Sequence, residues 1–162
     1  MAKVYLAHSI STRGEFEDSK RVANEIRALG FDVYAAAENA SINDKSNEPT
    51  PLDIYEGDVS EILSAEIFVV NLSGGLQDGT ISEVGVVAGL NEMDKIWAKE
   101  FGLRYKEYPI IAYTTNARLI HPQFYEGMAS ASANHLVLGM IERWGEFVGD
   151  ENAMLTKLKE CF

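Results

Sequence analysis

Short apolar runs alternate with amphipathic segments along the chain. Apolar, β-branched and aromatic runs, which are typical of buried strands, occupy residues 3–7, 31–36, 66–75, 106–115 and 135–141. The run at 66–75 is continuously apolar and closes with glycines, as expected of a strand that is buried on both faces. The pattern therefore predicts five strands.

The segments between these runs predict helices and one long loop. At 14–30, apolar residues recur at the spacing of one helical face, and Gly30 provides a stop. Residues 38–51 are polar, contain two prolines and predict a loop, and long loops in compact domains are often functional. Further helices are predicted at 52–65, after Gln77, at 91–107, at 121–134, and at 150–162 with Asp150 as N-cap.

Alternation of strands and helices is typical of a parallel sheet wrapped on both faces, and five strands favour a flavodoxin-like α/β fold. No repeat, linker or low-complexity segment interrupts the pattern, so residues 1–162 are predicted to form one domain. In such sheets ligands bind outside the carboxyl ends of the strands. Three stretches should therefore meet at the binding site, namely 7–12, 38–51 and 72–80.

Composition narrows the class of protein. The formal net charge of -11 argues against a nucleic-acid surface, because phosphate binding needs clustered lysines and arginines. A small nucleoside or nucleotide needs only one local pocket and stays compatible with this charge. The single cysteine, Cys161, cannot form an internal disulfide, and the first ten residues lack the apolar core of a signal peptide. No apolar run is long enough to span a membrane, so we expect a soluble, cytoplasmic protein.

Several common chemistries lack their motifs. The chain has no G-x-x-x-x-G-K-[ST] loop and no G-x-G-x-x-G after its first predicted strand, so a nucleotide-binding loop of either kind is not favoured. His8, His121 and His135 do not have metal-ligand spacing, and no metal or other cofactor is expected. Ser9 and Ser11 lie outside any G-x-S-x-G elbow, which disfavours a serine hydrolase.

Two carboxylates are better candidates for chemistry. Glu83 lies early in the helix after the third predicted strand, and Asp58 lies inside the preceding helix. An acid at a helix start can simply stabilise the helix dipole, by about 0.3–1 kcal/mol. The glycines favour a functional interpretation, because Gly79 lets the backbone approach a ligand, and Gly85 and Gly89 should let the helix pack tightly on its neighbours. We expect Glu83, near a helix N-terminus, to stay ionised as a carboxylate nucleophile must.

Three stretches together resemble a known family. They are "KVYLAHSI" at 3–10, "YEGDVSEILSAEIFVVNLSG" at 55–74, and "DGT" followed by "EVGVVAGLN" within 78–91. As a set they resemble the nucleoside 2-deoxyribosyltransferases. The resemblance implies a flavodoxin-like fold, a homo-oligomer, and cleavage of the N-glycosidic bond of 2'-deoxynucleosides. It also implies transfer of the sugar to a free nucleobase through a covalent ester on a glutamate.

By motif position, the resemblance assigns roles to particular residues. Glu83 would be the nucleophile that attacks C1', in a retaining double displacement. Asp58 would contact the base and manage its proton. An asparagine from a neighbouring subunit would complete the site, and Asn134 is the candidate. The substrate-binding set is expected to comprise His8, Ser9, Gln77, Asp78, Gly79 and Asn134.

One departure from the family pattern bears on the substrate. The family places an acid six residues before the nucleophile, where it binds the sugar 5'-hydroxyl, but this chain has Gln77 there and Asp78 next to it. Either Asp78 takes this role or Gln77 lines an uncharged 5' site. The second case resembles the 2'-deoxynucleoside 5'-phosphate N-hydrolases, with Ser9, Ser11 or Arg13 holding the phosphate. A nucleotide-sensing module without turnover is a third hypothesis, although such a binder needs no nucleophile.

Overall fold

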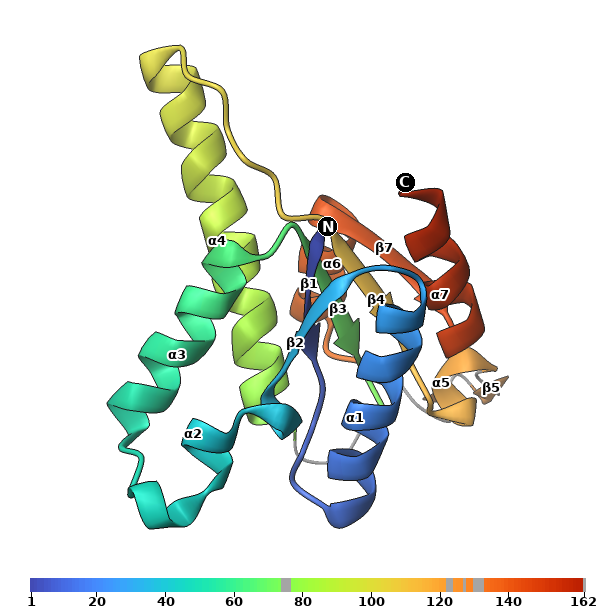
Figure 1. Ribbon diagram of the computed structural model, residues 1–162. Helices are drawn as coiled ribbons and strands as arrows, with labels where there is room; N and C mark the ends of the chain where they lie inside the picture. Colours follow the sequence, from blue (N-terminus) through green and yellow to red (C-terminus); the bar gives the residue numbers. More distant parts are fainter. Residues whose placement is uncertain (74–76, 122–123, 127, 130–132, 162) are drawn as a thin grey trace.

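The computed structural model describes residues 1–73, 77–121, 124–126, 128–129 and 133–161. Its centre is a five-stranded parallel sheet in the order β2-β1-β3-β4-β7 (Figure 1). The strands are β1 (Lys3–Ala7), β2 (Asp32–Ala35), β3 (Ile67–Asn71), β4 (Ile110–Tyr113) and β7 (Gly145–Gly149). This topology confirms the predicted flavodoxin-like α/β class, and it places the reversal of strand order between β1 and β3.

Helices cover both faces of the sheet. One face packs on α1 (Arg13–Ala28) and α7 (Glu151–Glu160), and the other packs on α3 (Pro51–Ser64), α4 (Asp78–Phe101) and α6 (His135–Trp144). Alternation along β1 distributes its side chains, with Val4 and Leu6 facing α1 and α7 while Tyr5 and Ala7 face the other layer. Tyr5 therefore points toward the helices that carry the two candidate carboxylates.

Local capping explains where several helices begin. Thr12 and Glu15 form a capping box at the start of α1, and Thr50 and Asp53 form another at the start of α3. In both boxes the threonine hydroxyl and the acid each satisfy a backbone N–H of the first turn. Asp150 accepts a hydrogen bond from Ala153 N at 2.9 Å, which confirms the predicted N-cap of α7.

The strand predicted at 135–141 is wrong, because these residues belong to helix α6. The buried side chains Val137, Ile141 and Trp144 recur at helical spacing, and Asn134 caps the helix by accepting from Leu136 N. A seven-residue apolar run cannot be assigned by periodicity alone. The last strand is β7, whose glycines and partly exposed side chains give it a weak pattern.

Other boundaries also differ from the predictions. The segment 121–134 is not one helix, because β5 (Phe124–Tyr125) and β6 (Met128–Ala129) form a small antiparallel ladder after α5 (Ala117–Ile120). Residues 122–123, 127 and 130–132 of this prediction lie outside the described residues. The separate helix predicted at 91–107 is instead the continuation of α4, which ends at Gly102 with a φ of 64°.

The predicted polar loop at 38–51 begins at the last residue of the helical turn η1 (Ala36–Glu38). It contains two further short turns, α2 (Ala40–Asn43) and η2 (Lys45–Asn47). The segment folds against the carboxyl end of β2, beside α3 (Figure 1). It therefore forms an ordered wall at the edge of the sheet where ligands are expected.

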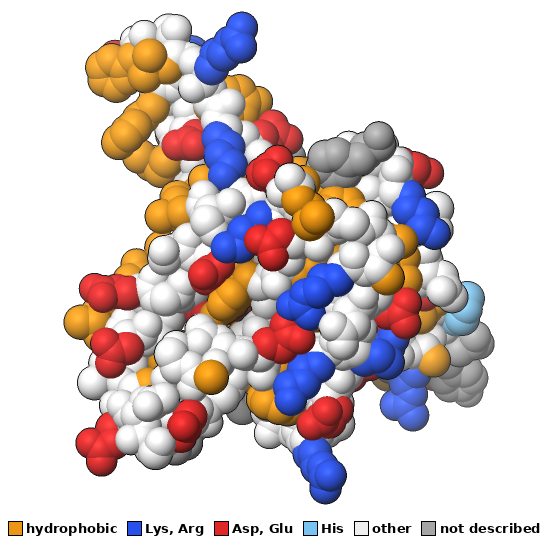
Figure 2. Space-filling view, viewed as in Figure 1, with side chains coloured by type: hydrophobic (Ala, Val, Ile, Leu, Met, Phe, Trp, Pro, Cys, Tyr) orange, Lys and Arg blue, Asp and Glu red, His pale blue; other side chains and the backbone are white. Residues whose placement is uncertain are grey.

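The second half of α4 projects beyond the sheet (Figure 1). It carries exposed apolar side chains, including Met93, Ile96, Trp97 and Phe101, and Figure 2 shows hydrophobic side chains gathered on this projection.

Within the described part of the chain, no helix combines the length and apolar character needed to cross a membrane.

Candidate active site

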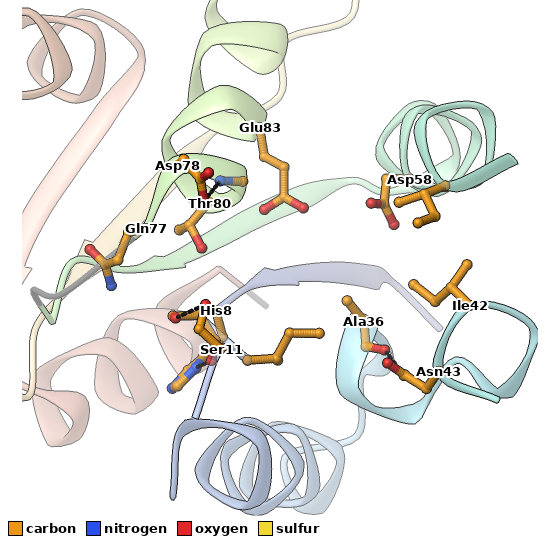
Figure 3. Close-up of a pocket in the computed structure, with 14 residues that line it drawn as sticks. His8, Ser11, Ala36, Ile42, Asn43, Asp58, Gln77, Asp78, Thr80 and Glu83 are labelled. Atoms are coloured by element: carbon orange, nitrogen blue, oxygen red, sulfur yellow. Dashed lines mark hydrogen bonds between the residues drawn. The ribbon is translucent and has the colours of Figure 1, made fainter. Parts of the chain in front are cut away.

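A pocket of about 270 Å³ opens at the carboxyl edge of the sheet, between the ends of β1 and β2 and the helices α3 and α4. The three stretches expected to meet at the site all contribute to it. Its lining is His8, Ser9, Ile10, Ser11, Ala36, Ile42, Asn43, Ile54, Asp58, Gln77, Asp78, Gly79, Thr80 and Glu83. Figure 3 shows Glu83 and Asp58 facing the same space from different helices.

Glu83 lies in the second turn of α4, and Tyr5 Oη donates a hydrogen bond to its Oε1 at 2.7 Å. Burial raises the pKa of Glu83 to about 8, the Tyr5 hydrogen bond lowers it, and the charge of Asp58 raises it further. The expectation that the helix N-terminus keeps Glu83 ionised is therefore wrong. The field of the helix falls off within its first turn, and Glu83 lies beyond that turn. Desolvation is then the dominant influence.

Asp58 lies in the middle of α3, and Tyr34 Oη donates a hydrogen bond to its Oδ1 at 2.8 Å. Burial also raises the pKa of Asp58, whereas the Tyr34 hydrogen bond lowers it. The rings of Tyr5 and Tyr34 pack against each other with centroids 5.1 Å apart. Each carboxylate therefore accepts a hydrogen bond from a different tyrosine, and the two tyrosine rings are in contact.

The end of the pocket near β1 is polar. His8 Nδ1 lies 2.7 Å from the Ser9 carbonyl oxygen, so this nitrogen carries a proton. Its Nε2 lies 2.8 Å from Asn71 Nδ2 and 3.2 Å from Asp18 Oδ2. A neutral ring accepts from Asn71, whereas a protonated ring donates to Asp18. Protein contacts thus fix the His8 ring in both states.

Gln77 and Asp78 both line this polar end. Gln77 Nε2 donates to the Asn71 carbonyl oxygen at 3.1 Å, and Asp78 Oδ1 accepts from Gly79 N at 2.9 Å. Gln77 is therefore tied to the end of β3, while the Asp78 carboxylate stays at the exposed first turn of α4. Both residues remain candidates for contact with the 5' end of a sugar.

Sequence comparison places this chain in a family. The family model described as nucleoside 2-deoxyribosyltransferase matches residues 4–152. The chain belongs to the nucleoside 2-deoxyribosyltransferase family. A comparison with curated protein sequences gives no match.

Two solved structures are similar to this family member. A conserved protein from Enterococcus faecalis V583 is 24% identical with a TM-score of 0.79, covering 100% of this chain and 99% of that chain. A 2-deoxyribosyltransferase from the psychrotolerant bacterium Bacillus psychrosaccharolyticus is 19% identical with a TM-score of 0.51, covering 73% of this chain and 76% of that chain. At these identities both comparisons support the fold.

Asn134, the family's inter-subunit candidate, lies outside the pocket lining. It is the N-cap of α6, and its Oδ1 accepts a hydrogen bond from Leu136 N at 2.9 Å. Its role therefore stays a prediction.

Gly85 and Gly89 do not provide the tight packing expected of them within this chain. A Cβ atom built on either residue would meet no atom within 4 Å. Together with Leu136 and Gly139, they line an open groove between α4 and α6.

Sequence reasoning missed the groups that surround the two carboxylates. Tyr5 and Tyr34 were assigned only to strands, although alternation along β1 already directs Tyr5 toward the α4 layer. The apolar wall of the pocket, which includes Ile42 and Ile54, comes from the polar segment 38–51 and from α3. No sequence motif marks these positions, because their role depends on how two non-adjacent strands and helices meet.

The raised pKa of Glu83 predicts a pH-dependent cost to stability. The folded protein holds this proton up to a pKa of about 8, whereas the ordinary value is 4.5, so its contribution to stability is fully present below pH 4.5 and is lost as pH rises through 8. Glu83→Gln keeps an acceptor for Tyr5 without the charge. We expect its melting temperature, relative to wild type, to rise across this window in scanning calorimetry. A difference that does not change with pH would contradict the assignment.

Proposed function

We propose that this family member transfers 2-deoxyribose between nucleobases, by cleaving the N-glycosidic bond of 2'-deoxynucleosides through a covalent ester on Glu83. The observation that carries the proposal is the convergence of Glu83 and Asp58, from two helices, on one pocket that is polar at one end and apolar at the other. Such an arrangement provides a nucleophile for the sugar and a proton carrier for the base within one pocket.

The shape of the pocket suggests how a nucleoside lies in it. At the end near Asp58, Ile42 and Ile54 offer an apolar surface for a base, and Asn43 Nδ2 donates to the Ala36 carbonyl oxygen at 2.6 Å. The sugar would then lie over Glu83, with its 5'-hydroxyl toward the polar end. Figure 3 shows Asp58 and Ile42 at one end of this space, Glu83 in the middle, and Gln77 and His8 at the other end.

The proposed reaction has two balanced halves. The Glu83 carboxylate attacks C1', the C1'–N bond breaks, and its electron pair stays on the base nitrogen, which takes a proton from Asp58. The deoxyribosyl ester is then attacked at C1' by the nitrogen of a second base. That base loses its proton to Asp58, and the Glu83 carboxylate leaves. Both groups return to their starting state, as in a retaining glycosidase.

The reactive state requires Glu83 ionised and Asp58 protonated. Burial raises the pKa of Glu83 to about 8, which disfavours the ionised form that the reaction needs. Positive charge that develops at C1' during bond cleavage favours the ionised carboxylate, so the pocket stabilises the nucleophile most when the sugar is reacting.

Acidic groups at the polar end favour a nucleoside over a nucleotide. Glu15 accepts hydrogen bonds from Thr12 N and Thr12 Oγ1, both at 2.8 Å, and its pKa is lowered by these bonds and by one with Ser9, which lines the pocket. Asp18 lies beside His8, and Asp78 lies on the opposite wall. Glu15 thus occupies the first turn of α1, where a 5'-phosphate would otherwise find backbone N–H donors. Arg13 is exposed and is not part of the lining.

The Asp78 carboxylate is expected to discriminate against a 5'-phosphate. Two like unit charges 4 Å apart repel by about 4 kcal/mol at an effective dielectric constant of 20, which corresponds to a preference of roughly a thousandfold. We expect wild type to show this preference in kcat/KM for deoxyadenosine over its 5'-monophosphate, and Asp78→Asn to narrow the gap. A wild type that prefers the monophosphate would support the N-hydrolase alternative.

A single incubation separates the candidate activities. The protein is mixed with deoxyinosine, with and without adenine, and the products are resolved by chromatography. New deoxyadenosine that appears only with adenine supports transfer, whereas deoxyribose released equally in both mixtures supports hydrolysis. Unchanged deoxyinosine together with binding by calorimetry would support a sensing module and overturn the proposal.

A homo-oligomer with a shared active site is part of the same proposal. The open groove between α4 and α6 and the exposed apolar side chains of α4 are surfaces that a second copy could cover. Asn134 lies at the end of α6 that borders this groove, and Glu83 lies on α4, which forms its other wall. In a two-fold interface each copy would bring its Asn134 toward the α4 helix of the other.

A further inference from the structure

Tyr34 Oη lies between two polar groups with opposite roles. It donates to Asp58 Oδ1 at 2.8 Å and accepts from Asn39 Nδ2 at 3.1 Å. The orientation of the Asn39 amide is fixed at its other end, because Oδ1 accepts from Ser41 N at 3.0 Å and a backbone N–H can only donate. The bonds therefore run in one direction, from the backbone of α2 through Asn39 and Tyr34 to Asp58.

This direction has a chemical consequence for Asp58. Since the Asn39 N–H points at the Tyr34 oxygen, the phenolic proton is directed to the Asp58 carboxylate. A hydrogen bond to a charged acceptor is stronger than one to a neutral carboxyl group, so the chain of bonds favours ionised Asp58. It also fixes the position of Oδ1, which leaves the other carboxylate oxygen for a ligand.

Within the described residues, Tyr5, which donates a hydrogen bond to Glu83, lacks a second group that orients its hydroxyl. Tyr5 Oη donates to Glu83 Oε1, and no second hydrogen bond to this hydroxyl is made by any residue that the structure describes. The two carboxylates thus have the same kind of donor, but only the donor to Asp58 is itself oriented by a further group. The segment that orients it, α2, also supplies Ile42 and Asn43 to the apolar end of the pocket.

We infer that Tyr34, oriented by Asn39, is a positioning residue for Asp58. It holds Asp58 where its carboxyl group can exchange a proton with the base. It also keeps this carboxyl group able both to give up that proton and to take it back. The catalytic use of Asp58 rests on the proposed function, whereas the effect of Tyr34 on Asp58 does not. Transfer between bases needs both directions of proton movement, and a group with balanced proton affinity serves both.

Other charged or titratable groups also face Asp58 and must stay constant in a test. Glu61 lies on the same helix and raises the pKa of Asp58, and it is paired with Lys3. Glu83 faces it from α4, and Tyr5 faces it from β1. The variants Tyr34→Phe and Asn39→Ala leave all four of these groups in place. Tyr34→Phe also keeps the ring that packs against Tyr5.

The test is a carbon-13 NMR titration of the side-chain carboxyl groups without any substrate. Wild type, Tyr34→Phe, Asn39→Ala and the matched control Tyr5→Phe are compared, with Asp58→Asn and Glu83→Gln used to assign the signals. We expect the pKa of Asp58 to rise in Tyr34→Phe and, by less, in Asn39→Ala. Tyr5→Phe should raise the pKa of Glu83 more than that of Asp58. An Asp58 titration unchanged in Tyr34→Phe would overturn the inference.

Kinetics then separate this inference from the proposed function. In pH profiles of kcat/KM for a deoxynucleoside, Tyr34→Phe and Tyr5→Phe should displace opposite limbs, whereas a purely structural role would lower the rate equally at every pH. If wild type transfers no deoxyribose but Asp58 still shifts in the NMR titration, the proposed function fails and the positioning role stands. If transfer occurs and the profile of Tyr34→Phe matches wild type, the positioning role fails alone.

Discussion

Glu83→Ala is expected to lose nearly all deoxyribosyl transfer. Without the group that forms the covalent bond, the double displacement cannot begin. Loss of a catalytic nucleophile lowers the rate by a factor on the order of 10⁴ to 10⁶. The measurement is the rate of deoxyadenosine formation from deoxyinosine and adenine. Glu56→Ala, which removes an exposed carboxylate from α3, is the matched control and should keep wild-type activity.

The covalent ester gives a second and more direct measurement. Wild type quenched after mixing with deoxyinosine alone should carry a 2-deoxyribosyl adduct on the peptide that contains Glu83, and the Glu83→Ala protein should carry none. An adduct on a different residue, or an active Glu83→Ala protein, would refute the assignment of the nucleophile.

The choice of variant matters because of Tyr5. Glu83→Ala leaves the buried Tyr5 hydroxyl without its acceptor, and an unsatisfied buried donor costs about 1–3 kcal/mol. Glu83→Gln retains an acceptor and removes the cost of desolvating the charge. Loss of activity in a Glu83→Gln protein that melts no lower than wild type would therefore exclude unfolding as the cause.

The parts of the fold that sequence could predict are those with a strong local pattern. β3 is entirely buried and reads as a continuous apolar run, and α1 has an apolar face. The segment of α6 has an equally apolar run, but its seven residues fit a strand as well as one face of a helix. β7 is only partly buried, and it has too few apolar residues to be predicted as the last strand.

The candidate site likewise has features that the sequence predicts and features that it does not. Glu83 and Asp58 could be named from sequence because they belong to motifs, and the pocket brings them together. Their proton affinities could not be predicted, because burial and the hydroxyls of Tyr5 and Tyr34 arise only from the tertiary structure. An argument from the helix dipole alone gave the wrong direction for Glu83. The proton affinities of the two carboxylates thus depend on the packed pocket.

Asp58→Asn is expected to slow the departure of the base while leaving sugar binding largely intact. The amide is nearly isosteric and can still meet Tyr34, but it cannot deliver a proton to the leaving nitrogen. Loss of general acid catalysis costs typically 10² to 10⁴ in rate. The loss should appear in kcat for deoxyinosine, with Glu56→Gln on the same helix as the matched control.

The leaving group decides whether Asp58 acts as an acid or only as a contact. p-Nitrophenyl deoxyriboside releases a stable phenolate that needs no proton, so Asp58→Asn should lose much less activity with this substrate than with deoxyinosine, provided that wild type accepts both. The ratio of the two losses is the measurement, because a general disturbance of the pocket would slow both substrates alike. Equal losses would remove the acid role from Asp58 and leave it as a residue that binds the base.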